Sequence, residues 1–533
     1  MTGVFLTVLL AALVALALAA KQLRVPYPIV FVIGGLVLAL IPGVPTVKLA
    51  PGTVFLLFLP ALIFGDGWTT DYRAFKRYAQ PIFSLAIGLV VVTATVVAFA
   101  AHWLMGLDLA LGFVLGAILS PTDAVATDAI AEEVGLPRRL ATIIGGESLI
   151  NDASGLVIYK FAVIAVATGA FSLLGATAQF FYVAVGGVAI GVGIAWLIAK
   201  LMAAVRDSGL SDETIAVSIS LVTPFALYVP ADALGASGVL AAMSGGIYLS
   251  RKSSQIFDAD ARIATASVWN LLFFVFNGAA FVLIGLQLRG IVGALHQQPL
   301  ATYVGWGVAI ALVVIAVRFA WVFPVSYGRR RLFPKVRQRE GPDPPRTWTV
   351  VLSLAGMRGI VSLAAALALP ERTASGAPFP GRDLILFVTF VVILVTLVGE
   401  GLLLPVLIRR FGIRELDGDD DGRLVALAKV RISEAAREHL RSLEPSFATT
   451  AEWEVAGRIH AHYEQRIAHY GTHLDGGDMG DDERQHEVER RLRGETYTAE
   501  RRALLALRGS GEISDTAYRR LEWEIDLSES RLT

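Results

Sequence analysis

Thirteen apolar runs, separated by short polar loops, fill the first 408 residues of this 533-residue chain. A helix needs about 20 predominantly apolar residues to cross the hydrocarbon core of a bilayer, and most of the runs have about that length. Charged residues make up only 17% of the chain, against about 25% in soluble domains. The sequence therefore predicts an all-α polytopic membrane protein. Its expected transmembrane helices are residues 3–20, 27–42, 53–66, 81–101, 109–129, 140–168, 178–200, 213–229, 234–250, 267–288, 299–326, 347–369 and 383–408.

The loops between these runs alternate in basic charge. One set of alternate loops carries nineteen Lys and Arg residues, whereas the other carries only Lys48, Arg289, Arg372 and Arg382. Because basic loops stay in the cytoplasm, this bias supports thirteen spans, with the N-terminus outside and the C-terminus cytoplasmic. We expect a multi-pass protein of the plasma (inner) membrane. A cleaved signal peptide is the alternative for the first run, but that run lacks a positively charged n-region.

Composition changes abruptly after the last apolar run. Residues 1–412 form the predicted transmembrane domain, and residues 413–533 form a predicted cytoplasmic, largely helical tail with helices at 423–443 and 486–530. The stretch Asp417–Asp421 matches the first half of a calcium loop, but Ala428 stands where that loop needs a bidentate Glu. We interpret the stretch as an acidic linker.

Six of the eight histidines lie in this tail. Histidine titrates near neutral pH, so one hypothesis is that the tail senses pH, and the other is that these are ordinary solvated side chains. The six residues are His439, His460, His462, His469, His473 and His486.

The order of the spans suggests two inverted halves of six, joined by one connecting helix. The fifth span carries Pro121 at its middle, and the corresponding twelfth span carries Gly356 and Gly359 around Arg358. Proline removes a backbone donor and disfavours helix at the residue before it. Unwound backbone at membrane depth is tolerated only where it lines a cavity or meets another polar group. We therefore predict two unwound helices that cross at mid-membrane.

Two carboxylates lie inside apolar runs, where a charge costs about 2.5–3.5 kcal/mol on insertion scales. Asp123 follows Pro121 and Thr122, and Asp152 lies about 18 Å into the sixth span at 1.5 Å per residue. Intramembrane carboxylates commonly face a cavity, a partner or a transported ion. We therefore predict that Asp123 and Asp152 bind a monovalent metal cation. The alternative is that they only join helices through hydrogen bonds.

Ser148 and Asp152 are four residues apart and share one face of the sixth span, which Asn151 flanks. A buried carboxylate is unfavourable when charged and alone, so Asp152 is expected to hold either a proton or a cation. Competition for this one group is enough to couple the two fluxes. Oxygen ligands suit Na+, Li+ or K+, and the chain contains no cysteine for softer metals.

Further charged residues lie at membrane depth. A buried arginine needs a partner, so we predict a structural ion pair between Glu147 and Arg358 that joins the sixth span to the twelfth. Arg318 lies near the inner end of its span and is expected to extend its charge to the interface. Lys160 is either a second residue of the ion site or a side chain that reaches the outer surface.

Two acidic residues complete the set. Glu400 is expected to make a hydrogen bond between packed helices. Asp66 lies between Gly65 and Gly67 and beside Trp68, so it either lines the cytoplasmic entrance or ends a helix at the interface.

Five stretches resemble the monovalent cation/proton antiporters of the sodium/hydrogen exchanger family, in its bacterial branch. The resemblance covers about residues 1–412 and is most specific at residues 120–126 and 147–152. The stretches are Leu59–Trp68, Ser120–Ala126, Glu147–Asp152, Asn277–Leu288 and Gly356–Leu363.

The resemblance implies a secondary transporter, not an enzyme, that exchanges protons for Na+, K+ or Li+. By the resemblance, Asp152 carries both ions, and Thr122, Asp123 and Ser148 are further ligands. The neutral Asn151 before Asp152 is typical of members that look electroneutral.

The resemblance also implies a homodimer in the lipid bilayer, with a dimerisation domain and a mobile core domain that moves like an elevator. No cofactor and no nucleic-acid partner is expected. The chain departs from several relatives at Gly65, where they have Glu, and Asp66 follows it.

Two other functions stay open from the residues alone. Two Asp residues on adjacent spans could share a proton in an intramembrane aspartyl protease, although the Gly-x-Gly-Asp stretch of such enzymes is not found around Asp123 or Asp152. A cation channel would show flux that ignores the proton gradient.

Overall fold

The computed structural model divides into two compact units, Met1–Glu415 and Leu416–Thr533, which are described separately. The residues that it describes are 2–41, 56, 58–123, 125–127, 129, 135–168, 173–209, 212–293, 295, 298–332, 344–373, 376–413, 418–474, 480–510, 512 and 514–529.

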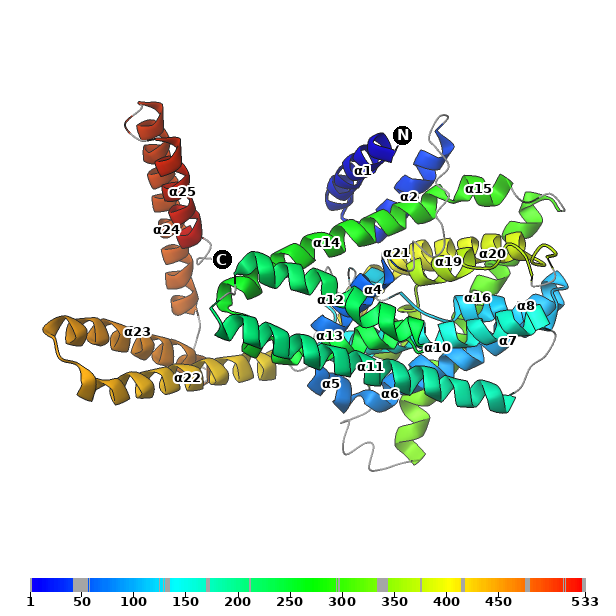
Figure 1. Cartoon of the computed structure of the whole chain (residues 1–533), viewed down its shortest axis with the longest axis horizontal. Helices are drawn as coiled ribbons and strands as arrows, with labels where there is room; N and C mark the ends of the chain where they lie inside the picture. Colours follow the sequence, from blue (N-terminus) through cyan, green and yellow to red (C-terminus); the bar gives the residue numbers. More distant parts are fainter. Residues whose placement is uncertain are drawn as a thin grey trace. The chain divides into compact units, whose positions relative to one another are not determined.

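Among the described residues of the first unit, the regular secondary structure is helical, and one isolated bridge joins Arg372 and Pro378 (Figure 1). Its helices are α1 (Thr2–Leu23), α2 (Tyr27–Leu40), α4 (Leu59–Thr69), α5 (Tyr72–Arg77), α6 (Ala79–Phe83), α7 (Val90–Met105), α8 (Leu109–Leu119), α10 (Arg138–Thr168), α11 (Leu173–Asp207), α12 (Glu213–Ala233), α13 (Gly238–Ile256), α14 (Ala259–Leu286), α15 (Leu288–Gly293), α16 (Leu300–Leu332), α18 (Arg346–Leu354), α19 (Ile360–Leu367), α20 (Arg382–Leu394) and α21 (Gly401–Phe411). Two π-helical segments, Ser84–Leu89 and Val395–Glu400, join α6 to α7 and α20 to α21.

Each of the thirteen apolar runs overlaps at least one of these helices, which confirms the all-α prediction. Among the described residues, seven helical stretches are long and apolar enough to cross a membrane. They are Ala79–Met105, Arg138–Ala167, Ala178–Asp207, Glu213–Ala233, Ala259–Gly293, Leu300–Gly328 and Arg382–Phe411. Thr7–Leu23, Tyr27–Leu40 and Leu109–Leu119 are shorter apolar helices. The count of thirteen spans stays a prediction.

Both expected helix breaks occur. The helix α8 ends at Leu119, immediately before Ser120 and Pro121. In the twelfth run, α18 ends at Leu354, the backbone is irregular through Gly359, and α19 begins at Ile360. The positions follow from the local backbone chemistry. Proline cannot donate a backbone hydrogen bond, and glycine loses more backbone entropy in a helix than any other residue.

The core of the first unit consists of two buried apolar clusters. One is centred on α8, α16, α19 and α20, and the other on α4, α11 and α13. Close helix contacts depend on small residues: a Cβ on Gly116 of α8 would lie 2.3 Å from the Ala94 carbonyl oxygen of α7. The short helix α4 contributes Leu62 to the first cluster and Ile63 to the second, so it lies where the two clusters meet.

Among its described residues, the second unit contains two pairs of α-helices and a short 3-10 helix, Glu444–Ser446. The helix α22 (Gly418–Leu443) packs on α23 (Thr450–Leu474), and α24 (Gly480–Gly509) packs on α25 (Asp515–Glu529) (Figure 1). The sequence-based interpretation missed α23 and merged α24 with α25. Of the stretch considered as a calcium loop, Asp417 and the side chains of Asp419–Asp421 lie outside the described residues.

Candidate functional site

The two helix breaks contact each other. The backbone amide of Asp123, just beyond the end of α8, donates to the Met357 carbonyl in the break between α18 and α19 at 2.7 Å. Freed backbone groups of one broken helix are therefore satisfied by the other, which is the condition for keeping such backbone away from water.

The Asp123 carboxylate holds this crossing together. One oxygen accepts from the Ile360 amide at the start of α19 at 3.2 Å, and the other accepts from the Val125 amide at 2.9 Å. A carboxylate at a helix N-terminus is stabilised by the unpaired amides and by the helix dipole. Asp123 thus has the structural role that the sequence left open, and it also lines the cavity described below.

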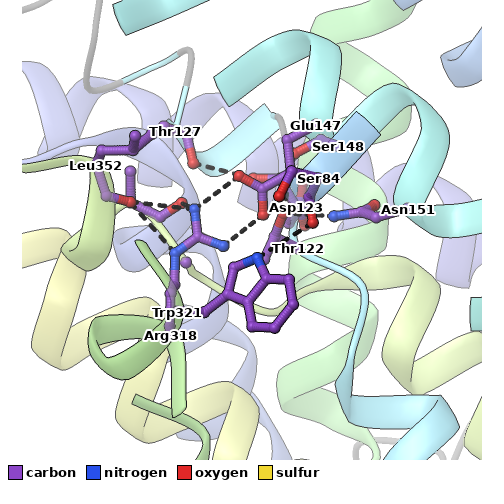
Figure 2. A network of polar contacts seen from close by, with 12 residues as sticks. Ser84, Thr122, Asp123, Thr127, Glu147, Ser148, Asn151, Arg318, Trp321 and Leu352 are labelled. Atoms are coloured by element: carbon purple, nitrogen blue, oxygen red, sulfur yellow. Dashed lines mark hydrogen bonds and ion pairs between the residues drawn. The ribbon is translucent and has the colours of Figure 1, made fainter. Parts of the chain in front are cut away.

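Three further predicted residues form a hydrogen-bonded group beside Asp123. The hydroxyls of Thr122 and Ser148 share a hydrogen bond of 3.1 Å, and Asn151 donates its side-chain amide to Thr122 at 2.7 Å. Figure 2 shows these side chains meeting between the break after α8 and the helix α10. All three are buried. The helical spacing of Ser148 and Asn151 therefore places both against the interrupted fifth span.

Asp152 faces a small cavity of about 40 Å³, one helical turn from Ser148. A water molecule needs about 10–15 Å³ of such volume, so the cavity has room for a small cation or a few waters. Three carboxylates line it, those of Asp66, Asp123 and Asp152. Its other lining residues are Phe58, Leu59, Leu62, Ile63, Val125, Ser148, Ile360, Val361 and Ala364.

The polar atoms of Asp152 and Asn151 are incompletely satisfied. Among the described residues, one carboxylate oxygen of Asp152 and the amide oxygen of Asn151 are buried without a hydrogen-bond partner. Asp123 and Asp66 both interact electrostatically with Asp152. A buried carboxylate among like charges requires compensation by a positive ion, either a proton or a metal cation.

The partner of Glu147 is Arg318, so the predicted pair with Arg358 is wrong. Arg318 makes a bidentate contact with Glu147, of which the Nη2–Oε2 bond is 2.8 Å, and it also donates to the carbonyls of Leu352 and Ala355. Figure 2 shows the guanidinium between Glu147 and Leu352. Arg318 is 0% exposed, so the expected extension of its charge to the interface is also wrong. The pair joins α10 and α16 to the end of α18.

Arg358 instead binds backbone carbonyls at the crossing. Its Nε donates to the Leu119 carbonyl at 3.1 Å, and its Nη1 donates to the Gly356 carbonyl. These carbonyls lie at or just beyond the C-terminal ends of α8 and α18, where a cation is favoured by the helix dipole. The structural role predicted for Arg358 is retained, with carbonyl oxygens in place of a carboxylate.

Of the two remaining charged candidates, Lys160 is exposed and Glu400 is buried. Lys160 lies 4.0 Å from Asp232, and both side chains are more than half exposed, so Lys160 lies on the surface and not in the cavity. Glu400 is buried beside the Gly356 backbone and the guanidinium groups of Arg358 and Arg318, and the hydrogen bond expected between helices stays a prediction.

Comparison with known proteins finds matches over most of the chain. Residues 8–410 match the family described as sodium/hydrogen exchanger, transmembrane. This chain belongs to that family. It is 33% identical over 451 residues to the sodium, potassium, lithium and rubidium/H+ antiporter of Bacillus pumilus, covering 82% of this chain and 65% of the relative. It is 32% identical over 528 residues to the uncharacterized Na+/H+ exchanger YjcE of Escherichia coli, covering 96% and 94%.

The fold of this exchanger is also found in a solved structure. The sodium proton antiporter MjNhaP1 of Methanocaldococcus jannaschii matches with a TM-score of 0.58 at 19% identity, over 76% of this chain and 98% of that chain. At this identity the match concerns the fold, which is all-helical in the described part of this exchanger.

Proposed function

We propose that this exchanger is a secondary antiporter that moves protons one way and Na+, K+ or Li+ the other way, with both ions competing for Asp152. The observation that carries the proposal is the Asp152 carboxylate itself, which is buried in a three-carboxylate cavity with one oxygen that no described donor reaches. A site of this kind is stable with a proton or with a metal cation, but not with both and not with neither.

The ligands proposed for the cation are oxygens of Asp152, Ser148 and Thr122, with Asn151 and Asp123 at the edge of the site. Both Asp123 oxygens already accept backbone amides, so we assign Asp123 mainly an electrostatic attraction for the cation. Asp66 lines the same cavity and is proposed as a further carboxylate near the cytoplasmic entrance. The name of the Bacillus pumilus relative, a sodium, potassium, lithium and rubidium/H+ antiporter, supports a set of alkali cations.

We propose electroneutral exchange, one proton for one cation. Asn151 precedes Asp152 and is hydrogen-bonded to Thr122, so it holds its place in the site without carrying a charge. Asp123 is committed to the backbone of the crossing, so of these two carboxylates we propose that Asp152 is the one that changes its bound ion. The same commitment disfavours the aspartyl protease alternative, because that reaction needs both carboxylates free to share a proton.

We further propose a homodimer in the plasma membrane, with the N-terminus outside and the tail cytoplasmic. The support is the asymmetry of basic loops in the sequence and the family to which the chain belongs.

The experiment uses purified protein in lipid vesicles with an imposed pH gradient and a pH-sensitive dye inside. Addition of Na+ or K+ to wild-type vesicles is expected to move protons, and Asp152→Asn is expected to abolish this movement. Asp232→Asn is the matched control, because it removes a carboxylate that is 55% exposed and outside the cavity. Exchange that persists in Asp152→Asn would refute the assignment of the carrier.

A further inference from the structure

A second buried carboxylate lies outside the proposed cation site. Glu400 ends the π-helical segment between α20 and α21 and is 3% exposed. Neither of its carboxylate oxygens accepts a hydrogen bond from a side chain among the described residues. It does not line the cavity of Asp152, so the proposed exchange does not use it.

Glu400 belongs to a cluster of four buried charges. Its polar neighbours are the guanidinium groups of Arg358 and Arg318 and the backbone of Gly356. The two arginines flank Gly356: a Cβ there would lie 2.8 Å from Arg318 Nε and 3.0 Å from Arg358 Nη1. Glu147, bound to Arg318, is the fourth member.

Among the described side chains, the neighbouring helices bring no further charge close to Glu400. The π-helical segment packs on α2, α16, α20 and α21. The helix α2 contains no charged residue, and α16 contributes Arg318. The charged residues of α20 and α21 stand at the far ends of those helices, and they are Arg382, Asp383, Arg409 and Arg410.

The net charge of the cluster therefore depends on Glu400. Arg318 and Glu147 neutralise each other through their bidentate contact. Among the described residues, the Arg358 guanidinium donates to carbonyl oxygens, which stabilise its charge without cancelling it. With Glu400 ionised the cluster is neutral, and with Glu400 protonated it carries one positive charge.

The segment around Arg358 lies between this charged cluster and the cation site and contacts residues of both. The Thr396 hydroxyl, on the same π-helical segment as Glu400, accepts from the Arg358 amide at 3.2 Å. The residues on either side of Arg358 contact Asp123: Met357 accepts the Asp123 amide, and Gly359 packs against the Asp123 carboxylate. An uncompensated positive charge in the Glu400 cluster would therefore repel a cation bound at Asp152.

We propose that Glu400 is a second proton-binding site, and that its proton weakens cation binding at Asp152 electrostatically. The inference rests on the proposed exchange at Asp152 but adds no transported ion to it. By linkage the effect is mutual: a cation bound at Asp152 favours release of the proton from Glu400.

The test is the dependence of the KM for Na+ on pH in Glu400→Gln, whose side chain has the shape of protonated Glu at every pH. Wild type and variant are expected to agree at acid pH. At alkaline pH the KM of the variant is expected to be about fivefold or more above that of wild type, the usual scale of coupling between two sites, with kcat retained. A KM equal to that of wild type at every pH would overturn the proposal while leaving exchange through Asp152 intact.

The matched control is Thr389→Val. Thr389 on α20 is also fully buried, and its hydroxyl has no partner among the described residues, but it carries no charge. Its KM profile is expected to follow wild type. A profile shifted like that of Glu400→Gln would mean that disturbance of the helix, and not loss of the charge, is the cause.

A measurement on the wild-type protein covers the case in which the variant does not fold. Infrared spectra of protein with isotope-labelled glutamate carboxyls separate these groups from every aspartate. Addition of Na+ at constant pH is expected to remove a glutamic-acid carbonyl band, because the cation drives the proton from Glu400. Spectra without any change in that band would contradict the inference.

Discussion

Gly359 shows how one missing methyl group permits the site. A Cβ at this position would lie 1.6 Å from a carboxylate oxygen of Asp123, far inside any real contact. Only glycine allows the Asp123 carboxylate to reach the start of α19, where it accepts the Ile360 amide. Gly359 thus both interrupts the helix and leaves room for the Asp123 carboxylate.

Gly359→Ala is therefore expected to abolish most exchange and to lower the free energy of unfolding by about 1–3 kcal/mol, the usual cost of forcing extra atoms into a packed site. Gly145→Ala on α10 is the control, because a Cβ there meets nothing within 4 Å. Vesicle exchange and thermal unfolding of both variants check this. Wild-type activity in Gly359→Ala would mean that the crossing does not depend on that close contact.

The site residues differ in how far sequence could predict them. Thr122, Ser148 and Asn151 come together as expected because the break at Pro121 and the helical spacing on α10 are local properties. The choice between Arg318 and Arg358 as partner of Glu147 is not local. Both arginines are buried. Glu147 binds Arg318, and carbonyl oxygens at the broken helix ends bind Arg358 in place of the expected Glu147 carboxylate.

At the scale of the elements, helix interruptions with a local chemical cause were predictable and the others were not. Proline and glycine mark the breaks after α8 and before α19. The two π-helical segments contain Gly88 and Gly399, but glycine also occurs inside unbroken helices such as α11 and so did not mark them. Each segment has a tertiary partner: the Ser84 carbonyl accepts from Trp321, and Thr396 accepts from Arg358. Contacts between distant helices identify them, and such contacts are not visible in one sequence.

The missed helix α23 does begin with a recognisable signal. Thr449 and Glu452 form a capping box: Glu452 accepts from the Ala448 and Thr449 amides at 2.8 Å, and its own amide donates to the Thr449 hydroxyl at 3.3 Å. These hydrogen bonds from Thr449 and Ala448 lower the pKa of Glu452 below its ordinary value. The low apolar content of the helix obscured this start.

The capping box predicts how the start of α23 responds to acid. A carboxylate whose pKa is lowered on folding stabilises the fold above its ordinary pKa, and that contribution is lost as pH falls through the lowered value. Amide hydrogen exchange at residues 450–453 of the full-length protein should therefore accelerate at acid pH and, at neutral pH, in Glu452→Gln. The exposed neighbour Glu454 accepts neither of these amide hydrogen bonds and supplies the control Glu454→Gln, for which neutral-pH exchange equal to wild type is expected. Equal protection in wild type and Glu452→Gln would mean that Glu452 does not stabilise the start of α23.

At the scale of the whole molecule, the alternation of apolar runs and basic loops was enough to predict an all-helical membrane unit followed by a charged helical unit. It was enough because the bilayer permits few solutions for an apolar chain. The tail is less constrained, since charged amphipathic helices pair in several ways. A role of its histidines in pH sensing stays a prediction, as do the homodimer and the orientation in the membrane.

A proton and a metal cation are proposed to exclude each other at Asp152. Titration of the purified protein with Na+ at a series of fixed pH values tests it most directly. In the acid range, where Asp152 holds its proton, the account predicts that the apparent Kd rises about tenfold for each unit that pH falls, and that Asp152→Asn binds no Na+ at this site. A Kd that does not change with pH, or Na+ binding of wild-type strength in Asp152→Asn, would contradict it.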